Sequence, residues 1–298
     1  MLNGQERLQK AEKQKKIKKQ SQFREVMKRL FQNKLAVAGM IIFVLYILIA
    51  ILAPLLTPYN IAELNLPEKN QSPSLAHLCG TDNYGRDILA RLMYGTRYSL
   101  GLGLGSVLIG LLVGVLLGCI AGYFGGWVEE LIMRFCDLMQ AIPGTLLAIC
   151  ISMILGTGFF NTIIALGIGR IPLNSRMVRA QFLSQRKLEY VEAAQATNCS
   201  KPKLMFVHIL PNTISPLIVI NTMGVGGVIM MAAGLSFINL GVQPPIPEWG
   251  AMITAAKDYM RNYPYQVLAP GIFMAIFILA MNLFGDGLRD AMDPKLKT

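Results

Sequence analysis

The stretch Leu35–Leu56 reads LAVAGMIIFVLYILIAILAPLL, contains no charged residue and is followed by Pro58. A bilayer-spanning helix needs roughly 20 apolar residues, because the hydrocarbon layer is about 30 Å thick and each helical residue rises about 1.5 Å. The run is too long for a secretory signal peptide and lacks a small-residue cleavage site. It therefore predicts a first transmembrane helix over residues 35–56.

The remainder of the chain has the same apolar character. Of its 298 residues, 53% are hydrophobic and only 15% are charged, whereas soluble domains carry about 25% charged residues. Glycines recur in the run GLGLGSVLIGLLVGVLLG, where they let helix backbones approach closely. Five further stretches are long enough to span a bilayer: Ser99–Gly122, Phe135–Leu155, Phe160–Phe182, Ile214–Leu240 and Val267–Phe284. We therefore predict an all-α integral membrane protein with six transmembrane helices.

The charge distribution predicts the orientation of these helices. Before the first span, eleven lysine and arginine residues stand against three acidic residues, and short basic flanks stay in the cytoplasm. A basic arm can also neutralise nucleic-acid phosphates, but an arm joined to a membrane helix favours anionic headgroups, so we expect the lipid bilayer and no nucleic acid as its partner. With six spans, both termini and the basic segment 186–203 are then cytoplasmic.

These features divide the chain into five parts. They are a basic cytoplasmic N-terminal arm over residues 1–34, a first transmembrane helix over 35–56, an extracytoplasmic loop over 57–97, a core of five transmembrane helices over 98–288 and a cytoplasmic C-terminal tail over 289–298. The extracytoplasmic loop is balanced, with four basic and four acidic residues, which agrees with its predicted side of the membrane.

The cytoplasmic segment Tyr190–Asn212 reads YVEAAQATNCSKPKLMFVHILPN. Its E-A-A run favours a helix, and Asn198 interrupts that helix. Pro202 suits the first turn of a second helix, which we expect Pro211 to end. The sequence therefore predicts a short helical hairpin that projects into the cytoplasm. The alternative is an ordinary amphipathic hairpin that lies on the membrane surface.

This hairpin resembles the EAA coupling loop of the permease subunits of binding-protein-dependent ABC importers. Glu192-Ala193-Ala194 and Ile209-Leu210-Pro211 match the family's E-A-A and I-L-P elements, and Asn198 stands where the family has glycine. Asparagine is the next best residue after glycine for a left-handed turn. The resemblance implies that loop 186–212 docks in a groove of an ATPase and couples ATPase closure to the membrane helices. The implied coupling residues are Glu192, Ala193, Ala194, Asn198, Leu204, His208, Leu210 and Pro211.

Three further motifs resemble the C-type permease of the oligopeptide, dipeptide and nickel group of these importers. G-T-D-x-x-G-R-D is unbroken at Gly80–Asp87, and Y-G-x-R-x-S-L follows at Tyr94–Leu100. The segment Leu235–Met252 matches S-F-L-G-L-G-x-x-P-P-x-P-x-W-G, with Ile238 and Asn239 in place of leucine and glycine. The ending N-x-x-G-D-x-L-R-D-x-x-D-P also matches, at residues 282–294. The resemblance implies a type I ABC importer permease fold in a bacterial cytoplasmic membrane.

The first of these motifs lies in the predicted extracytoplasmic loop. Its members are Gly80, Thr81, Asp82, Gly85, Arg86 and Asp87. Its charged side chains and Arg91 can pair with one another, so the motif either holds the loop folded or contacts a substrate-binding protein. The proline-rich stretch 241–250 cannot continue a helix and places Trp249 near the outer interface. We expect it to form an outer gate or hairpin, with simple interface anchoring as the alternative.

A few polar residues lie within the apolar stretches. Arg170, Asn174, Asn221 and Asn282 are costly in lipid, so they should face protein or a water-filled path. Arg170, Asn174 and Asn221 are the candidates for lining a translocation pathway. Arg170 could meet a peptide carboxylate there, or it could lie near a helix end and reach the interface.

The sequence predicts no chemistry of its own for this subunit. It contains no G-x-x-x-x-G-K-[ST] phosphate loop and no candidate nucleophile with a base, so we expect no enzyme activity. Five scattered cysteines and two histidines predict neither a disulfide framework nor a metal site. We expect no cofactor on this chain, with ATP and magnesium held by partner subunits.

The resemblance implies an importer with several other subunits. They are a B-type permease, two ATP-binding subunits and an extracytoplasmic substrate-binding protein, and the expected solutes are di- and oligopeptides. Nickel or a metal–chelator complex is the alternative solute. A stand-alone secondary transporter or channel would need acidic residues inside the membrane, whereas Glu129, Glu130 and Asp137 stand at the start of the third span. The pattern therefore favours the importer.

Overall fold

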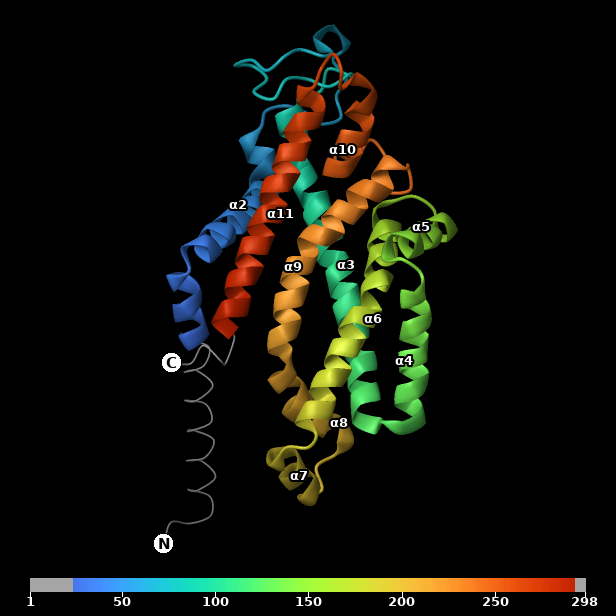
Figure 1. Cartoon of the computed structure of the whole chain (residues 1–298). Helices are drawn as coiled ribbons and strands as arrows, with labels where there is room; N and C mark the ends of the chain where they lie inside the picture. Colours follow the sequence, from blue (N-terminus) through green and yellow to red (C-terminus); the bar gives the residue numbers. More distant parts are fainter. Residues whose placement is uncertain (1–23, 293–298) are drawn as a thin grey trace.

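The computed structural model describes residues 24–292, so most of the predicted N-terminal arm and the last six residues lie outside the described part. Within that part every regular element is helical. The main helices are α2 (Lys34–Leu56), α3 (Ile88–Phe124), α4 (Gly126–Ala141), α5 (Gly144–Leu155), α6 (Phe159–Gln185), α7 (Glu189–Ala196), α8 (Lys201–Lys203), α9 (Leu210–Phe237), α10 (Trp249–Ala256) and α11 (Tyr265–Met292). Figure 1 shows them as one elongated bundle.

Each predicted span corresponds to one helix or to a bent helix pair. In the described residues, four continuous helical stretches are long and apolar enough to cross a membrane: Lys34–Leu56, Ile88–Phe124, Lys201–Phe237 and Tyr265–Met292. The pair α4–α5 adds a fifth if it is one broken span. The 27-residue helix α6 packs along α3 but is less apolar, because it contains three arginines.

The third span is broken, so the single helix predicted over Phe135–Leu155 is wrong. Helices α4 and α5 meet at an angle of 92°. Ile142 has extended backbone angles (φ −92°, ψ 127°), as expected for a residue before a proline, and Pro143 has no N–H to continue the helix.

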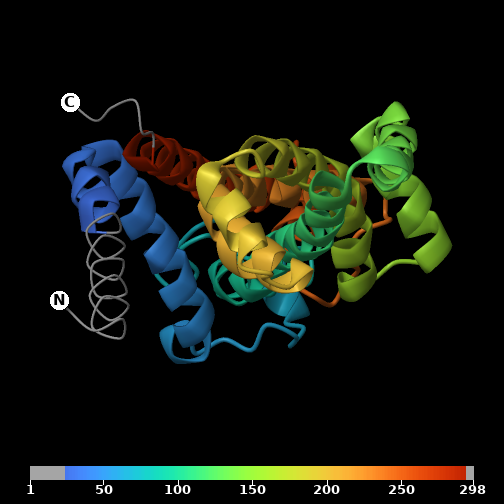
Figure 2. The ribbon, with the colours of Figure 1, turned by 90° about the horizontal axis from the view of Figure 1, so that it is seen from below.

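The pair α3 and α6 forms the centre of the bundle. A Cβ on Gly114 would lie 2.5 Å from Cβ of Asn174, and one on Gly118 would lie 2.6 Å from the carbonyl oxygen of Ser175. The two backbones therefore touch, which confirms the prediction from the glycine-rich run. Helix α2 lies on one flank of the bundle beside α11, and α4–α5 lie on the opposite flank (Figures 1 and 2).

The two ends of the bundle differ. The hairpin of α7 and α8 lies at one end, and the loop before α3 lies at the other (Figure 1). Helix α3 begins at Ile88, inside the predicted loop 57–97, because the side chain of Asp87 caps it by accepting from the N–H of Ala90.

The second helix of the hairpin does not end at Pro211, contrary to the prediction. It passes through a π-helical stretch, Leu204–Ile209, into α9. There the N–H of Leu210 donates to the carbonyl of Met205, and Pro211 falls in the first turn of α9, where a missing N–H costs little. The second arm of the hairpin is thus continuous with a membrane-spanning helix.

Candidate functional site

The hairpin turns at Asn198, directly after α7. Asn198 has a positive φ of 57°, a conformation that glycine and then asparagine adopt at lowest cost. Its N–H donates to the carbonyl of Gln195 at 2.9 Å, and the N–H of Cys199 donates to the carbonyl of Ala194 at 3.1 Å. These bonds form a Schellman motif. The expected left-handed asparagine in place of the family glycine is therefore confirmed.

The hairpin has a buried side and an exposed side. Val191 and Leu204 are fully buried and pack in one apolar cluster with Phe182 of α6. Leu204, expected on the docking surface, therefore fills the contact between hairpin and bundle. Glu192 and Ala193 point away from this cluster and are exposed. Of the other predicted coupling residues, Ala194, His208 and Leu210 are half-buried, and Asn198 and Pro211 are exposed.

Tyr190, which the sequence analysis did not single out, ties the base of the hairpin together. Its hydroxyl donates to Oε1 of Gln185 at the end of α6, at 2.8 Å. The side-chain amide of Asn212 lies 3.4 Å from the same hydroxyl and donates to the carbonyl of His208 at 2.8 Å. Helices α6 and α9 are thus connected through one tyrosine where the hairpin joins the bundle.

We expect Asn198→Gly to preserve the hairpin and Asn198→Val to weaken it. Glycine adopts a positive φ without steric cost, whereas a β-branched residue is strained there by about 1–2 kcal/mol. The measurement is the apparent melting temperature of the purified chain in detergent. Thr197→Val is the control, because Thr197 has a negative φ of −84°. Equal losses from valine at both positions would contradict this account of the turn.

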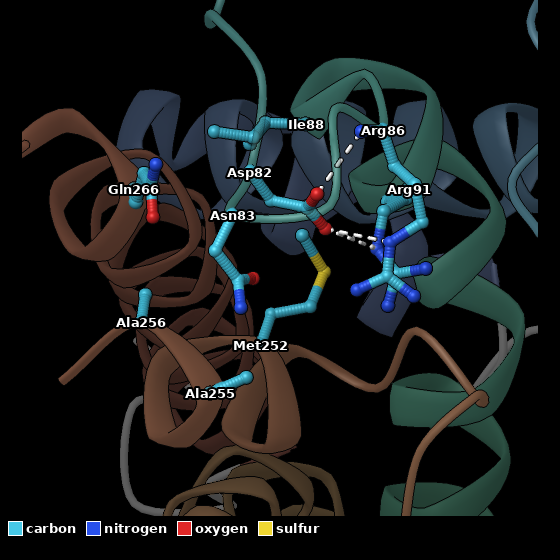
Figure 3. A pocket seen from close by; sticks show the side chains of 9 residues that line it. All are labelled: Asp82, Asn83, Arg86, Ile88, Arg91, Met252, Ala255, Ala256 and Gln266. Atoms are coloured by element: carbon cyan, nitrogen blue, oxygen red, sulfur yellow. Dashed lines mark hydrogen bonds and ion pairs between the residues drawn. The ribbon is translucent and has the colours of Figure 1, made fainter. Parts of the chain in front are cut away.

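At the opposite end, Asp82 organises the G-T-D-x-x-G-R-D loop. Its carboxylate accepts from the backbone N–H of Tyr84 at 2.8 Å and of Arg86 at 3.0 Å, and from Nε of Arg86 at 2.7 Å. Nε of Arg91 lies 3.8 Å from the same carboxylate. Figure 3 shows both guanidinium groups beside Asp82, at the edge of a small pocket. The expected pairing with Arg86 and Arg91 is therefore found for Asp82.

Asp87, the last residue of the motif, has a different partner. Its carboxylate caps α3 through the N–H of Ala90 at 2.6 Å and lies 2.9 Å from Nδ1 of His77. Gly85 is required for a close approach: its φ is 75°, and a Cβ there would lie 1.7 Å from the carbonyl oxygen of Asn65. The loop is therefore fastened both to α3 and to the segment before it.

The motif side chains mainly hold the loop folded. Thr81 is fully buried, and Arg86 and Asp87 are 8% and 6% exposed. Gly80 adopts a positive φ of 75°. A contact with another protein would have to come from exposed neighbours such as Tyr84, which is 44% exposed. The two expected roles were to hold the loop folded and to contact a substrate-binding protein. For the buried residues Thr81, Arg86 and Asp87 the geometry supports the first role.

A junction at the end of the bundle opposite the hairpin was missed from the sequence. The carboxylate of Glu248 is fully buried. It accepts from the N–H groups of Gly250 (2.9 Å) and Ala251 (2.8 Å) and from the hydroxyls of Ser99 and Ser236 (both 3.3 Å). Burial raises the pKa of this carboxyl, and the four hydrogen bonds act in the opposite direction. The only signal in the sequence was one acid inside an apolar motif.

Trp249, which was expected near the outer interface, does not expose its side chain to lipid or water in this chain. Its side chain is fully buried, with ring centroids 5.7 Å from Tyr46, 5.4 Å from Phe273 and 5.7 Å from Phe277. Its indole N–H donates to the carbonyl of Leu92 at 3.3 Å. The proline-rich stretch turns this ring inward, where aromatic packing outweighs an interfacial position.

Asn239 also stands where the family pattern has glycine, and the physical explanation is the same as for Asn198. Asn239 has a positive φ of 60° at the end of α9. Its N–H donates to the carbonyl of Ser236, and the N–H of Leu240 donates to the carbonyl of Leu235, both at 2.9 Å. This is again a Schellman motif with asparagine at the left-handed position.

The predicted pathway residues lie at the contact between α6 and α9. Asn174 and Asn221 are buried and bonded to each other, with Nδ2 of Asn221 donating to Oδ1 of Asn174 at 2.8 Å. They therefore face protein. Arg170 lies one turn away, and its guanidinium rests on Gly224 of α9, where a Cβ would lie 2.1 Å from Nη2. Asn282, by contrast, is exposed on α11.

The chain matches known protein families over most of its length. Residues 114–298 match the family model described as the binding-protein-dependent transport system inner membrane component. The chain belongs to this family. Residues 21–73 of the permease also match the N-terminal transmembrane domain of oligopeptide transport permease C. It is thus a C-type permease subunit of an ABC importer.

Several named relatives cover nearly the whole permease. A dipeptide transport system permease of Alkalihalophilus pseudofirmus is 46% identical over 93% of this chain and 91% of its own length. A glutathione transport system permease of Pectobacterium atrosepticum is 42% identical over 93% and 92%. A di/tripeptide transport system permease of Pseudomonas aeruginosa is 42% identical over 93% of both chains.

Solved structures with the same fold are more distant in sequence. An inward-facing MetNI methionine ABC transporter chain has a TM-score of 0.55 at 17% identity and covers 69% of this chain and 98% of its own. A chain of an amino acid ABC transporter has a TM-score of 0.51 at 16% identity, with coverages of 67% and 92%. The permease therefore has the expected all-α ABC importer permease fold.

Proposed function

We propose that this permease forms one half of the translocation pathway of an ABC importer for di- and oligopeptides, driven by partner ATPases through the hairpin. The observation that carries the proposal is the exposed α7, which stands at one end of a membrane bundle and packs through Val191 on Leu204, in the helical stretch that continues into α9. Force applied to α7 would reach a membrane-spanning helix through this buried apolar contact.

The proposed orientation puts the hairpin and both termini in the cytoplasm. Basic side chains gather around the hairpin, namely Arg176, Arg179, Arg186, Lys187, Lys201 and Lys203. Such a concentration of lysine and arginine supports a cytoplasmic position for the hairpin. The G-T-D-x-x-G-R-D loop, at the opposite end, then faces the side from which a substrate-binding protein would deliver the solute. A bacterial cytoplasmic membrane is the proposed location.

Family membership supports the rest of the assembly. We propose a B-type permease as the second half of the pathway, two ATP-binding subunits at the hairpins and one extracytoplasmic binding protein. The three relatives described above are named for dipeptides, di- and tripeptides and glutathione, which favours peptides over nickel. In this proposal ATP hydrolysis belongs to the partner subunits.

The experiment is purification of the tagged full chain from its native membrane in mild detergent, with identification of the co-purified subunits and an ATPase assay. We expect a second permease and ATP-binding subunits, with ATPase activity stimulated by peptide-loaded binding protein. Recovery of the chain alone, active in proton- or sodium-driven uptake, would instead identify a secondary transporter.

A further inference from the structure

Arg170 is a cation in the middle of the bundle that has no anionic partner among residues 24–292. Its Nε is buried and makes no hydrogen bond. Among residues 24–292, every ion pair involves other basic side chains. The neighbouring arginines of α6 are paired, Arg176 with Asp137 and Arg179 with Glu129. Arg170 is therefore the exception on its helix.

Arg170 lies inside α6 rather than at one of its ends. It lies eleven residues after Phe159 and fifteen before Gln185, the ends of α6, which is about 16 Å and about 22 Å along the helix axis. Its guanidinium rests against Gly224 of α9, between two helices. A charge buried between membrane helices is costly, so an anion or water must lie beside it.

Two glycines shape the space around this side chain. On α9, a Cβ at Gly224 would lie 2.1 Å from Nη2 and 2.6 Å from Cζ of Arg170. On α3, a Cβ at Gly110 would lie 2.6 Å from Cβ of Arg170. The guanidinium is thus held in a slot that any larger residue would close, one turn from the mutually satisfied pair Asn174 and Asn221.

We propose that Arg170 is a carboxylate-binding residue of the translocation pathway, which pairs with the free C-terminal carboxylate of a passing peptide. This rests on the proposed function. A guanidinium offers a planar fork of donors that matches a carboxylate. In this proposal the anion arrives with the solute, and the pairing is broken again when the solute leaves.

The test uses the complete transporter in proteoliposomes, with trialanine and its C-terminal amide as the two solutes. The quantity measured is the ratio of the uptake rates, trialanine over amide, for each variant. The same binding protein serves every variant, so its own preference cancels between variants. Arg170→Gln should lower this ratio about 10- to 100-fold, the loss expected for a hydrogen-bonded charge pair.

Two further variants separate charge from geometry. Arg170→Lys keeps the charge without the fork and should lower the ratio less. Gly224→Ala keeps the arginine but places a methyl group where its guanidinium lies, so the ratio should fall here too. Arg134→Gln is the control, because Arg134 is 72% exposed on α4, and it should leave the ratio unchanged.

The outcomes distinguish this inference from the proposed function. If Arg170→Gln lowers uptake of both peptides equally, Arg170 pairs with another subunit. If uptake of both peptides is unchanged, Arg170 binds no solute. Either result overturns the inference. If Arg170→Gln does not assemble, the ratio in Gly224→Ala decides in the same way. Failure of the wild-type transporter to take up either peptide would reject the proposed function itself.

Discussion

Ala193→Asp is expected to abolish ATP-dependent uptake while leaving the chain inserted in the membrane. Ala193 is exposed on α7, and its small side chain would let the helix lie deep in a groove of a partner. An aspartate there adds bulk and a charge that docking would have to desolvate. The measurement is recovery of the ATP-binding subunits with the tagged chain, together with uptake, and we expect both to be lost.

Ala62→Asp is the matched control for this change. Ala62 is also exposed, but it lies in the loop at the opposite end of the bundle. The same substitution there should leave recovery of the ATP-binding subunits unchanged. Full recovery and full uptake with Ala193→Asp would show that α7 is not the docking surface. A test at Leu204 would be uninformative, because that side chain is buried and its replacement would disrupt the hairpin itself.

Glu248→Ala is expected to lower the stability of the permease strongly. The change leaves the N–H groups of Gly250 and Ala251 and the hydroxyls of Ser99 and Ser236 without their acceptor. Each buried donor left unpaired costs about 1–3 kcal/mol, but removing the carboxylate also removes the cost of burying it, so we expect a net loss of roughly 2–5 kcal/mol. The apparent melting temperature in detergent should then fall by roughly 5–15 °C.

Glu130→Ala provides the comparison for that measurement. Glu130 is 68% exposed and pairs only with an exposed arginine of the same helix, and such pairs contribute about 0–1 kcal/mol. A melting temperature for Glu248→Ala within one or two degrees of the Glu130→Ala value, roughly the effect of half a kcal/mol, would show that the buried carboxylate is dispensable.

Local features of this fold could be predicted from the sequence. The length and apolarity of each span are properties of one contiguous stretch, and so is the left-handed turn at Asn198, which depends on one residue and the helix before it. The bend between α4 and α5 was missed although Pro143 was visible, because apolarity continues through it and the third span was inferred from apolarity alone.

Contacts between distant residues could not be predicted in this way. Ser99 and Glu248 are 149 residues apart in the chain. Arg97 donates to the carbonyls of Ala50 and Ile51 in α2, where Pro54 removes the N–H that would have bonded to Ala50. Such contacts depend on how three helices pack. The motifs could therefore be recognised in the sequence, but the contacts that their residues make could not be predicted.

The most direct test of the central claim is accumulation of a labelled dipeptide by proteoliposomes that contain the complete transporter. We expect accumulation that requires ATP, the second permease and the ATP-binding subunits, and that persists when the proton and sodium gradients are collapsed. Accumulation by this chain alone, driven by either gradient and indifferent to ATP, would contradict the account.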